Sequence, residues 1–182
     1  MKQGDLVHTS LNFLKDRLSK NNGLMEIYTG NGEYEEVKCT FREPVTIEQI
    51  NEIESKSGWT FPEDYKEFLL ITNGCKLFDH PCYGGENELY RLEDLIECNY
   101  EDPFEDCFSI AYVYAENIVI NSERFRSGDP NYLFVKGKID HFHEAEPLNM
   151  NFEMWLDRFI ICQGSKFWNW NFWNAKRYYK EF

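Results

Sequence analysis

Apolar residues recur at helical spacing near the start of the chain. Val7, Leu11, Leu14 and Leu18 follow one another at intervals of three or four residues, which places them on one face of a helix. We therefore predict an amphipathic helix over residues 6–20. The stretch Asn-Asn-Gly that follows predicts where this helix ends.

The next segment has the pattern of two strands joined by a tight turn. Residues 24–29 and 33–41 are rich in β-forming residues and are separated by Gly-Asn-Gly. An Asn-Gly pair favours the positive φ angles of a hairpin turn. We predict a β-hairpin over residues 24–41.

A second helix is predicted from its start and stop signals. Thr46 is followed three residues later by Gln49, and this spacing has the form of a capping box. Gly58 predicts the end of the helix just after Ser57. Three isoleucines at helical spacing mark the predicted buried face: Ile47, Ile50 and Ile53.

The segment FPEDYKEFLLITNGC predicts a third helix. Pro62 suits the first helical position, where no amide partner is needed. Glu63 and Asp64 follow in the first turn, where the helix dipole favours negative charge. Asn73-Gly74 predicts a left-handed exit from the helix. The residues that share one face, and are expected to be buried, are Tyr65, Phe68, Leu69 and Thr72.

The second half of the chain predicts strands followed by a helix. Residues 108–115 and 117–121 are rich in β-forming residues, and residues 132–143 predict a strand pair or one bent strand. The intervening SERFRSGDPN predicts a loop. Asn151 is the predicted N-cap of a helix that ends at Gly164. Its apolar stripe consists of Phe152, Trp155, Leu156 and Phe159.

These elements together predict one α+β domain with an antiparallel or mixed β-sheet flanked by helices. We find no internal repeat, low-complexity linker or domain boundary, so we expect residues 1–182 to form a single domain. A chain of this length buries roughly 70% of the surface that its unfolded form exposes. We therefore expect it to fold without a metal or a disulfide.

The order of the motifs resembles the SUKH superfamily, which is named in part after a yeast cell-wall assembly regulator. The family pattern is a (L/F)PxxY(K/R)xFL…NG segment, then strands, then a helix that begins sFxx(F/W)L. The matching positions here are Phe61, Pro62, Tyr65, Lys66, Phe68, Leu69, Asn73, Gly74, Phe152, Trp155 and Leu156. The resemblance implies a SUKH-like core over about residues 44–162. Residues 1–43 would form an N-terminal helix-hairpin extension, and residues 163–182 an aromatic C-terminal arm.

The resemblance also implies a function. Most bacterial members look like immunity proteins, which are encoded near polymorphic toxins, often nucleases, and neutralise them by direct binding. It implies that this chain is an antitoxin that blocks a cognate toxin by stoichiometric occlusion, without catalysis. Two alternatives stay open: a general regulatory adaptor of the cell-wall-regulator type, and a small-molecule-binding domain or enzyme that uses His141 and His143.

The chain is strongly acidic. It has 32 Asp and Glu residues against 19 Lys and Arg, a formal net charge of -13. Such a chain repels nucleic acid and anionic membranes, which bind proteins through Lys and Arg. It suits a basic protein partner, such as a toxin nuclease domain. The plainer alternative is that net charge only keeps the protein in solution.

The acidic residues are densest between residues 86 and 106, where Arg91 is the one basic residue. Apolar residues such as Leu95 and Ile96 are interleaved with the carboxylates. Carboxylates would speed association with a basic toxin, and apolar anchors would prolong the complex. The alternative is an ordinary solvated face. The predicted partner-binding residues are Glu93, Asp94, Glu97, Tyr100, Glu101, Asp102, Phe104, Glu105 and Asp106.

Candidate chemistry is sparse. The sequence has no GxSxG, P-loop or GxGxxG motif and no CxxC pair. Cys75, His80 and Cys82 lie close together but lack a fourth ligand at the usual zinc spacing. His141 and His143 would share one strand face, as a surface pair or as part of a metal site. We expect no metal, no cofactor and no catalysis.

The C-terminal tail, residues 167–182, is half aromatic. Its tryptophans, with Lys176 and Arg177 nearby, have the composition of a base-stacking groove. Aromatic side chains more commonly cover a sheet or strand edge, and a homodimer contact is a further alternative. The N-terminus lacks the apolar segment of a secretory signal, and no stretch approaches the roughly 18 apolar residues of a membrane span. We expect a cytoplasmic protein.

Overall fold

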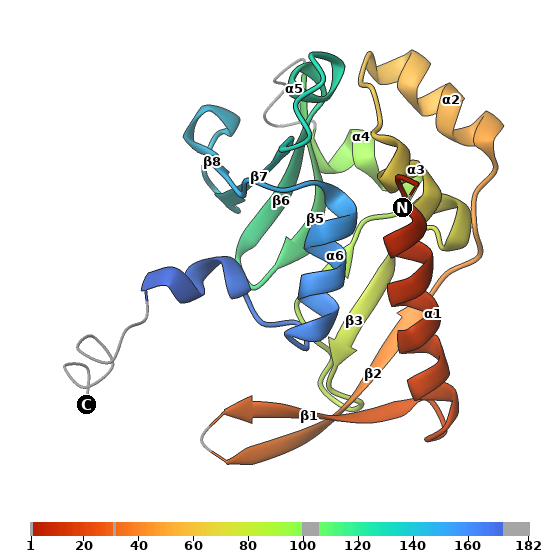
Figure 1. The fold of residues 1–182 in the computed structure, drawn as a ribbon, viewed down its shortest axis with the longest axis vertical. Coiled ribbons are helices and arrows are strands. Elements are labelled where there is room, and N and C mark those ends of the chain that lie inside the picture. Colours follow the sequence, from red (N-terminus) through yellow and green to blue (C-terminus); the bar gives the residue numbers. More distant parts are fainter. Residues whose placement is uncertain (1, 31, 100–105, 173–182) are drawn as a thin grey trace.

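The chain forms one antiparallel sheet whose strands follow the order of the sequence (Figure 1). The computed structural model describes residues 2–30, 32–99 and 106–172. Within this part of the chain, each strand pairs with its neighbours in sequence. The strands are β1 (Leu24–Gly30), β2 (Glu33–Phe41), β3 (Cys75–Asp79), β4 (Asn87–Leu89), β5 (Cys107–Val113), β6 (Glu116–Asn121), β7 (Leu133–Gly137) and β8 (Glu146–Pro147).

Helices accompany the sheet, so the predicted α+β class is confirmed. The α-helices are α1 (Asp5–Ser19), α2 (Ile47–Ser57), α3 (Glu63–Ile71), α4 (Leu95–Cys98), α5 (Ser122–Arg126) and α6 (Phe152–Ile161). Short 3-10 helices are η1 (Leu92–Asp94), η2 (Phe142–Glu144) and η3 (Phe167–Phe172). Figure 1 shows α1 and α6 side by side in front of the sheet, and both contact α3. No helix among the described residues is long and apolar enough to cross a membrane.

Two of the predicted helix starts are confirmed by their hydrogen bonds. The Thr46 hydroxyl accepts from the amide of Gln49 at 3.4 Å, and the Gln49 side chain accepts from the amide of Thr46 at 2.8 Å. The Asn151 side chain accepts from the amide of Met154 at 3.0 Å. Each cap satisfies amides that the first turn of a helix leaves without a partner. These two caps fix where α2 and α6 begin.

Three details near α2 and α3 differ from the predictions. Ile47 is 42% exposed because it lies at the first position of α2, beside rather than on the buried face that Ile50 occupies. Pro62 is the N-cap of α3, with extended backbone, and does not occupy the first helical position. At the other end, Thr72 leaves the helix in an extended conformation, and the positive φ belongs to Gly74.

The segments on either side of β7 also differ from the predictions. The predicted loop SERFRSGDPN contains α5, because Asn121 caps a helical turn by accepting from the amide of Arg124 at 2.9 Å. Residues 132–143 are neither a strand pair nor one bent strand. Strand β7 ends at Gly137, and a turn leads to η2. Strand β7 pairs with β6 on one side and with β8 on the other.

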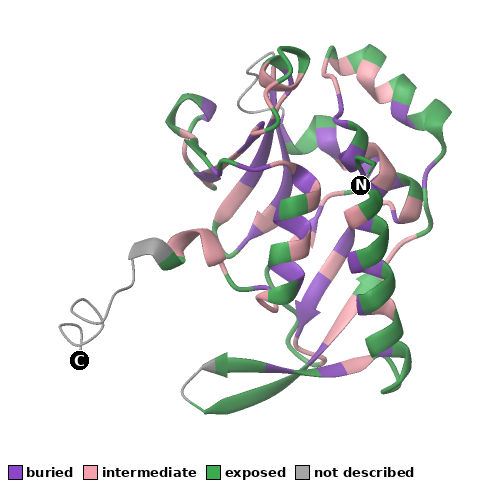
Figure 2. Ribbon diagram, viewed as in Figure 1, coloured by how far each residue is buried: buried purple, intermediate pink, exposed green. Residues whose placement is uncertain are grey.

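The predicted hairpin at residues 24–41 is confirmed, and it extends the sheet. Strand β1 pairs with β2, and β2 pairs with β3. The far part of the hairpin projects beyond the helices in Figure 1 and is exposed in Figure 2. Near the body, Met25, Ile27 and Val37 are buried in the main core. The N-terminal extension is therefore continuous with the rest of the sheet.

The start of the aromatic tail packs on the core. The Trp168 ring lies 6.4 Å from the ring of Trp155 and 6.3 Å from that of Phe159. Its indole Nε1 donates to a carboxylate oxygen of Glu116 at 2.8 Å. Trp168 therefore covers α6 and ties it to β6. Residues 173–182 lie outside the described part of the chain, and the homodimer contact stays a prediction.

Candidate functional site

The two halves of the sequence motif meet in the core, where α3 packs on α6. The Tyr65 ring lies 5.4 Å from Phe61 and 5.1 Å from Phe152, and Phe68 lies 5.3 Å from Phe152. The motif residues without exposed surface are Phe61, Tyr65, Phe68, Leu69, Phe152, Trp155 and Leu156. Edge-to-face aromatic contacts of this kind add about 0.5–1.5 kcal/mol each beyond area burial. These side chains build the scaffold.

Gly74 allows the chain to pass close to β4 on leaving α3. Its φ is +69°, a conformation that side chains with a Cβ rarely adopt. A Cβ at this position would lie 2.5 Å from the carbonyl oxygen of Leu89 and 2.6 Å from that of Tyr90. Both of these atoms are backbone and cannot rotate away. Only glycine therefore fits where β3 begins beside β4.

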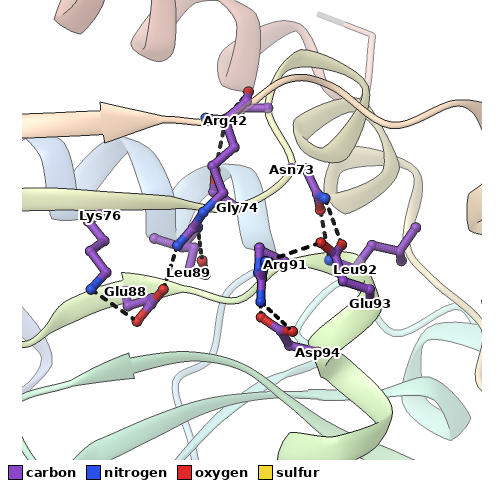
Figure 3. Close-up of polar contacts among 11 residues, drawn as sticks. Arg42, Asn73, Gly74, Lys76, Glu88, Leu89, Arg91, Leu92, Glu93 and Asp94 are labelled. Atoms are coloured by element: carbon purple, nitrogen blue, oxygen red, sulfur yellow. Dashed lines mark hydrogen bonds and ion pairs between the residues drawn. The ribbon is translucent and has the colours of Figure 1, made fainter.

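Asn73 connects the end of α3 to the start of the acidic segment, which runs from Glu93 to Asp106 (Figure 3). Its side-chain oxygen accepts from the amide of Leu92 at 2.7 Å, and its side-chain nitrogen donates to Glu93 at 2.7 Å. The first contact satisfies an amide at the start of η1. The second fixes the position of a carboxylate. The Asn-Gly pair of the motif thus positions the first residues of the acidic segment.

Carboxylates near this point pair with cations of the same chain (Figure 3). Arg91 donates through Nε and Nη2 to the two oxygens of Asp94, at 2.6 and 2.8 Å, and lies 3.5 Å from an oxygen of Glu93. On β4, Glu88 accepts from Arg42 at 2.6 Å and lies 3.7 Å from Lys76. Partly exposed pairs of this kind contribute little to the stability of the fold. Exchanging them for a partner's cations would therefore cost little.

This scaffold is shared with known proteins. Residues 44–158 match the SMI1 / KNR4 family (SUKH-1). The chain belongs to this family. It is similar to "Uncharacterized protein YobM" of Bacillus subtilis (strain 168), with 35% identity over 185 residues that cover 97% of this chain and 98% of YobM. It is also similar to "Uncharacterized protein YnaB" of the same organism, with 35% identity over 147 residues, 80% of this chain and 96% of YnaB. The SUKH resemblance seen in the sequence is confirmed.

In this SUKH protein, the predicted toxin-facing residues are only partly described. Glu93 and Asp94 lie in η1 and share Arg91. Asp106 pairs with Arg126, which follows β6 on α5. Glu97 lies on α4 and has no ion-pair partner among the described residues. The other predicted residues lie outside the described part of the chain: Tyr100, Glu101, Asp102, Phe104 and Glu105.

Leu95 cannot serve as the apolar anchor that the sequence predicts. It is fully buried, because α4 turns this side chain into the main core. Ile96, its neighbour, is 40% exposed, so the prediction of an apolar anchor stays open for this side chain. Asn99 holds the end of α4 in place, since its side chain accepts from the amide of Ser109 at 2.6 Å and donates to the carbonyl of Leu95 at 2.7 Å. The sequence pattern gave no sign of this buried amide contact.

Asp64 is buried and joins the starts of α3 and α6, which the sequence analysis did not predict. Its carboxylate accepts from the Tyr132 hydroxyl, 2.6 Å from Oδ2, and from the amides of Tyr65 and Glu153 at 3.1 and 3.0 Å. The Tyr132 hydroxyl in turn accepts from the amide of Phe152 at 3.1 Å. Burial raises the pKa of Asp64, and the hydrogen bonds from Tyr132 and Glu153 oppose that rise.

The candidate metal ligands do not come together. His141 precedes η2 and His143 lies within it, so they do not share a strand face, although their rings stack 5.6 Å apart. The His80 ring nitrogen Nδ1 accepts from the amide of Cys82 at 3.1 Å, while Cys75 is buried in the core. Burial also raises the pKa of the Cys75 thiol, which disfavours the thiolate that metals bind. Among the described residues, no three His, Cys, Asp or Glu side chains form a group that could hold a metal ion.

Proposed function

We propose that the protein is an intracellular immunity protein that binds a cognate polymorphic toxin and neutralises it by stoichiometric occlusion. Membership of the SMI1 / KNR4 family (SUKH-1) carries this proposal. The toxin we favour is a basic nuclease domain. Such a domain presents Lys and Arg to bind phosphate, and a chain with a net charge of -13 is complementary to that surface. No catalysis or cofactor is required.

The proposed contact is the acidic segment from Glu93 to Asp106. Three features support it. Asn73 fixes the start of the segment, Ile96 adds an exposed apolar side chain, and Glu97 has no ion-pair partner among the described residues. The ion pairs at Asp94 and Asp106 are partly exposed and easily exchanged. Carboxylates in this position would occupy the cations that the nuclease needs for its substrate.

Co-expression tests the proposal directly. The toxin candidate encoded beside this gene is expressed with and without the protein, and a catalytically inactivated form of it is used to measure binding. We expect growth to be rescued and a complex of fixed stoichiometry to be isolated. Unrescued growth and no complex would reject the immunity role. Capture of a non-toxic regulatory protein from the native cell would support the adaptor alternative.

A surface hollow supports the second alternative, a small-molecule-binding domain. It has a volume of about 460 Å³ and lies between β8, the end of α6 and η3. Its lining includes Met150, Arg158, Trp168 and Trp170, which offer a cation and aromatic faces. This hollow lies away from His141 and His143, which do not line it. A ligand that co-purifies with the protein and is lost in the variant Arg158→Ala would favour this alternative.

A further inference from the structure

The hairpin β1–β2 presents one face to solvent. In the ladder, Glu26 lies opposite Glu36 and Tyr28 lies opposite Tyr34. Since side chains alternate along a strand, these four share one face, while Met25 and Val37 on the other face are buried. Figure 2 shows the outer part of the hairpin exposed. We call the four residues Glu26, Tyr28, Tyr34 and Glu36 the hairpin face.

The carboxylates of the hairpin are not neutralised. Glu26 and Glu36 are like charges directly opposite each other, an arrangement that destabilises a strand pair. Glu33 and Glu35 are also exposed. Among the described residues, none of these four carboxylates forms an ion pair. The one basic residue of the hairpin, Lys38, donates to the carbonyl of Pro81 at 3.3 Å.

Two exposed tyrosines lie on the same face as Glu26 and Glu36. Tyr28 is 52% exposed and Tyr34 is 69% exposed, and their rings lie 5.6 Å apart at an interplanar angle of 61°. The Tyr28 hydroxyl accepts from the amide of Gly32 at 3.2 Å. The Tyr28 amide donates to the side chain of Gln163 at 2.7 Å, which ties the strand to the body. Tyr28 is therefore held at both its hydroxyl and its amide, and the Tyr34 ring packs against it.

We propose that the hairpin face is a docking surface for a Lys- and Arg-rich protein face. Guanidinium and ammonium groups would relieve the repulsion between Glu26 and Glu36, and would lie on the faces of Tyr28 and Tyr34 as cation–π partners. Exposed tyrosine beside carboxylates is also the composition of an interface anchor with a charged rim. A second copy of the chain would bring the same carboxylates together and is disfavoured. The identity of the partner as the toxin rests on the proposed function.

The charge distribution distinguishes this surface from the acidic segment. Near α3, Glu88, Glu93 and Asp94 already share Arg42, Lys76 and Arg91. A partner there must replace cations that are in place. At the hairpin, the described residues hold no paired cation for it to replace. The hairpin also lies outside the residues 44–158 that match the family. The hairpin would thus add a contact of its own to the shared scaffold.

A probe of known composition tests the surface without the toxin. Isotope-labelled protein is titrated with a short peptide of alternating arginine and glycine, and amide chemical shifts are followed. We expect the largest shifts within residues 24–38. The double variant Glu26→Gln/Glu36→Gln should bind the peptide about three- to tenfold more weakly at low ionic strength. The matched control Glu48→Gln/Glu123→Gln removes the same charge elsewhere and should change affinity less than about twofold.

The inactivated toxin provides the second readout. If wild-type protein binds it, Glu26→Gln/Glu36→Gln and Tyr34→Ala should each raise the Kd at least about fivefold, while the control pair does not. Largest peptide shifts in residues 86–99, or a hairpin variant with wild-type affinity for both probes, would overturn the docking surface. If wild-type protein does not bind the toxin but the peptide shifts map to the hairpin, the immunity role fails and the docking surface stands.

Discussion

The hydroxyl of Tyr132 lies 2.6 Å from Oδ2 of Asp64, although the two residues are 68 positions apart in the sequence. The same carboxylate accepts from the amide of Glu153 at the start of α6. One buried acid therefore joins α3, the strand β7 that follows Tyr132, and α6. This acid gives the fold a pH dependence that can be measured.

Asp64→Asn should remove part of the dependence of stability on pH. Burial raises the folded-state pKa of Asp64 above its usual value of 3.8. Between the unfolded and folded pKa values the native state binds more protons, so wild-type stability falls as pH rises through that window. The stability advantage of wild type over Asp64→Asn should therefore shrink as the pH rises above 3.8, as measured by urea unfolding. Tyr132→Phe removes a hydrogen bond that lowers this pKa, so its loss of stability should extend to higher pH. An advantage that grows with pH would contradict this assignment.

Gly74→Ala should destabilise the protein more than a second glycine substitution with a similar backbone angle. The added Cβ would meet the Leu89 and Tyr90 carbonyl oxygens at 2.5 and 2.6 Å. The control is Gly58→Ala, where φ is +78° and no atom lies within 4 Å of the added Cβ. We expect the control to lower the free energy of unfolding by about 1–2 kcal/mol. Gly74→Ala should lower it by at least about 1 kcal/mol more. If urea unfolding gives equal losses of stability for the two variants, the backbone near Gly74 moves to make room for the added Cβ.

Glu36→Lys should stabilise the hairpin. It replaces the like-charge pair with Glu26 by an opposite-charge pair, which contributes roughly 0.2–1 kcal/mol on a strand ladder. Glu33→Lys is the control, because it makes the same change in net charge opposite Gly30. In thermal unfolding, Glu36→Lys should have a higher melting temperature than Glu33→Lys. The reverse order would mean that the carboxylates of Glu26 and Glu36 do not repel each other in solution.

Trp168→Ala should destabilise the protein by about 2 kcal/mol, because the half-buried indole covers Trp155 and Phe159. Trp170→Ala, at a side chain that is 54% exposed, should cost less than about 0.5 kcal/mol. Equilibrium denaturation of both variants shows whether the tail stabilises the fold. Similar small losses would show that the tail contributes little to the fold, and would favour partner binding as its role.

Replacing Glu97, Glu101, Asp102, Glu105 and Asp106 with Gln or Asn should slow association with the inactivated toxin and flatten its salt dependence. The reason is that clustered carboxylates steer a basic partner at low ionic strength. Stopped-flow association at two salt concentrations measures both quantities, and Glu48→Gln/Glu123→Gln shows the effect of removing two carboxylates outside the segment. An on-rate and a salt slope equal to wild type would exclude this segment as the toxin-facing surface.

The sequence predicted the helix starts and the hairpin, which depend on contacts between residues that are close in the chain. The Thr46–Gln49 cap, the Asn151 cap and the pairing of β1 with β2 each depend on residues close to one another in the sequence. Strands β3 and β4 were not predicted, because CKLFD and NEL are too short to carry a periodicity. Their pairing depends on the close passage at Gly74, which is a tertiary contact.

The candidate site was harder to predict than the fold, because charge counts do not reveal pairing. The sequence identified the acidic segment by density alone. The carboxylates at Asp94 and Glu88 turned out to share cations from the same chain, whereas Glu26 and Glu36 on the hairpin have none among the described residues. Asp64 was placed correctly in the first turn of α3, yet its burial depends on Tyr132 and α6, which lie far along the chain.

The contact between α1 and α6 has a consequence for how the protein is made. Each strand pairs with its sequence neighbour, so the sheet can assemble progressively as the chain leaves the ribosome. Helix α1 can pack on β1 and α3 at that stage but not on α6. Its bonds to α6 are those from Ser10 to Asp157 at 2.6 Å and from the amide of Gly4 to Glu153 at 2.9 Å. The apolar stripe of α1 therefore completes its packing only after α6 has been made. Until then, the α6-facing side of α1 is a surface that a chaperone could bind during translation.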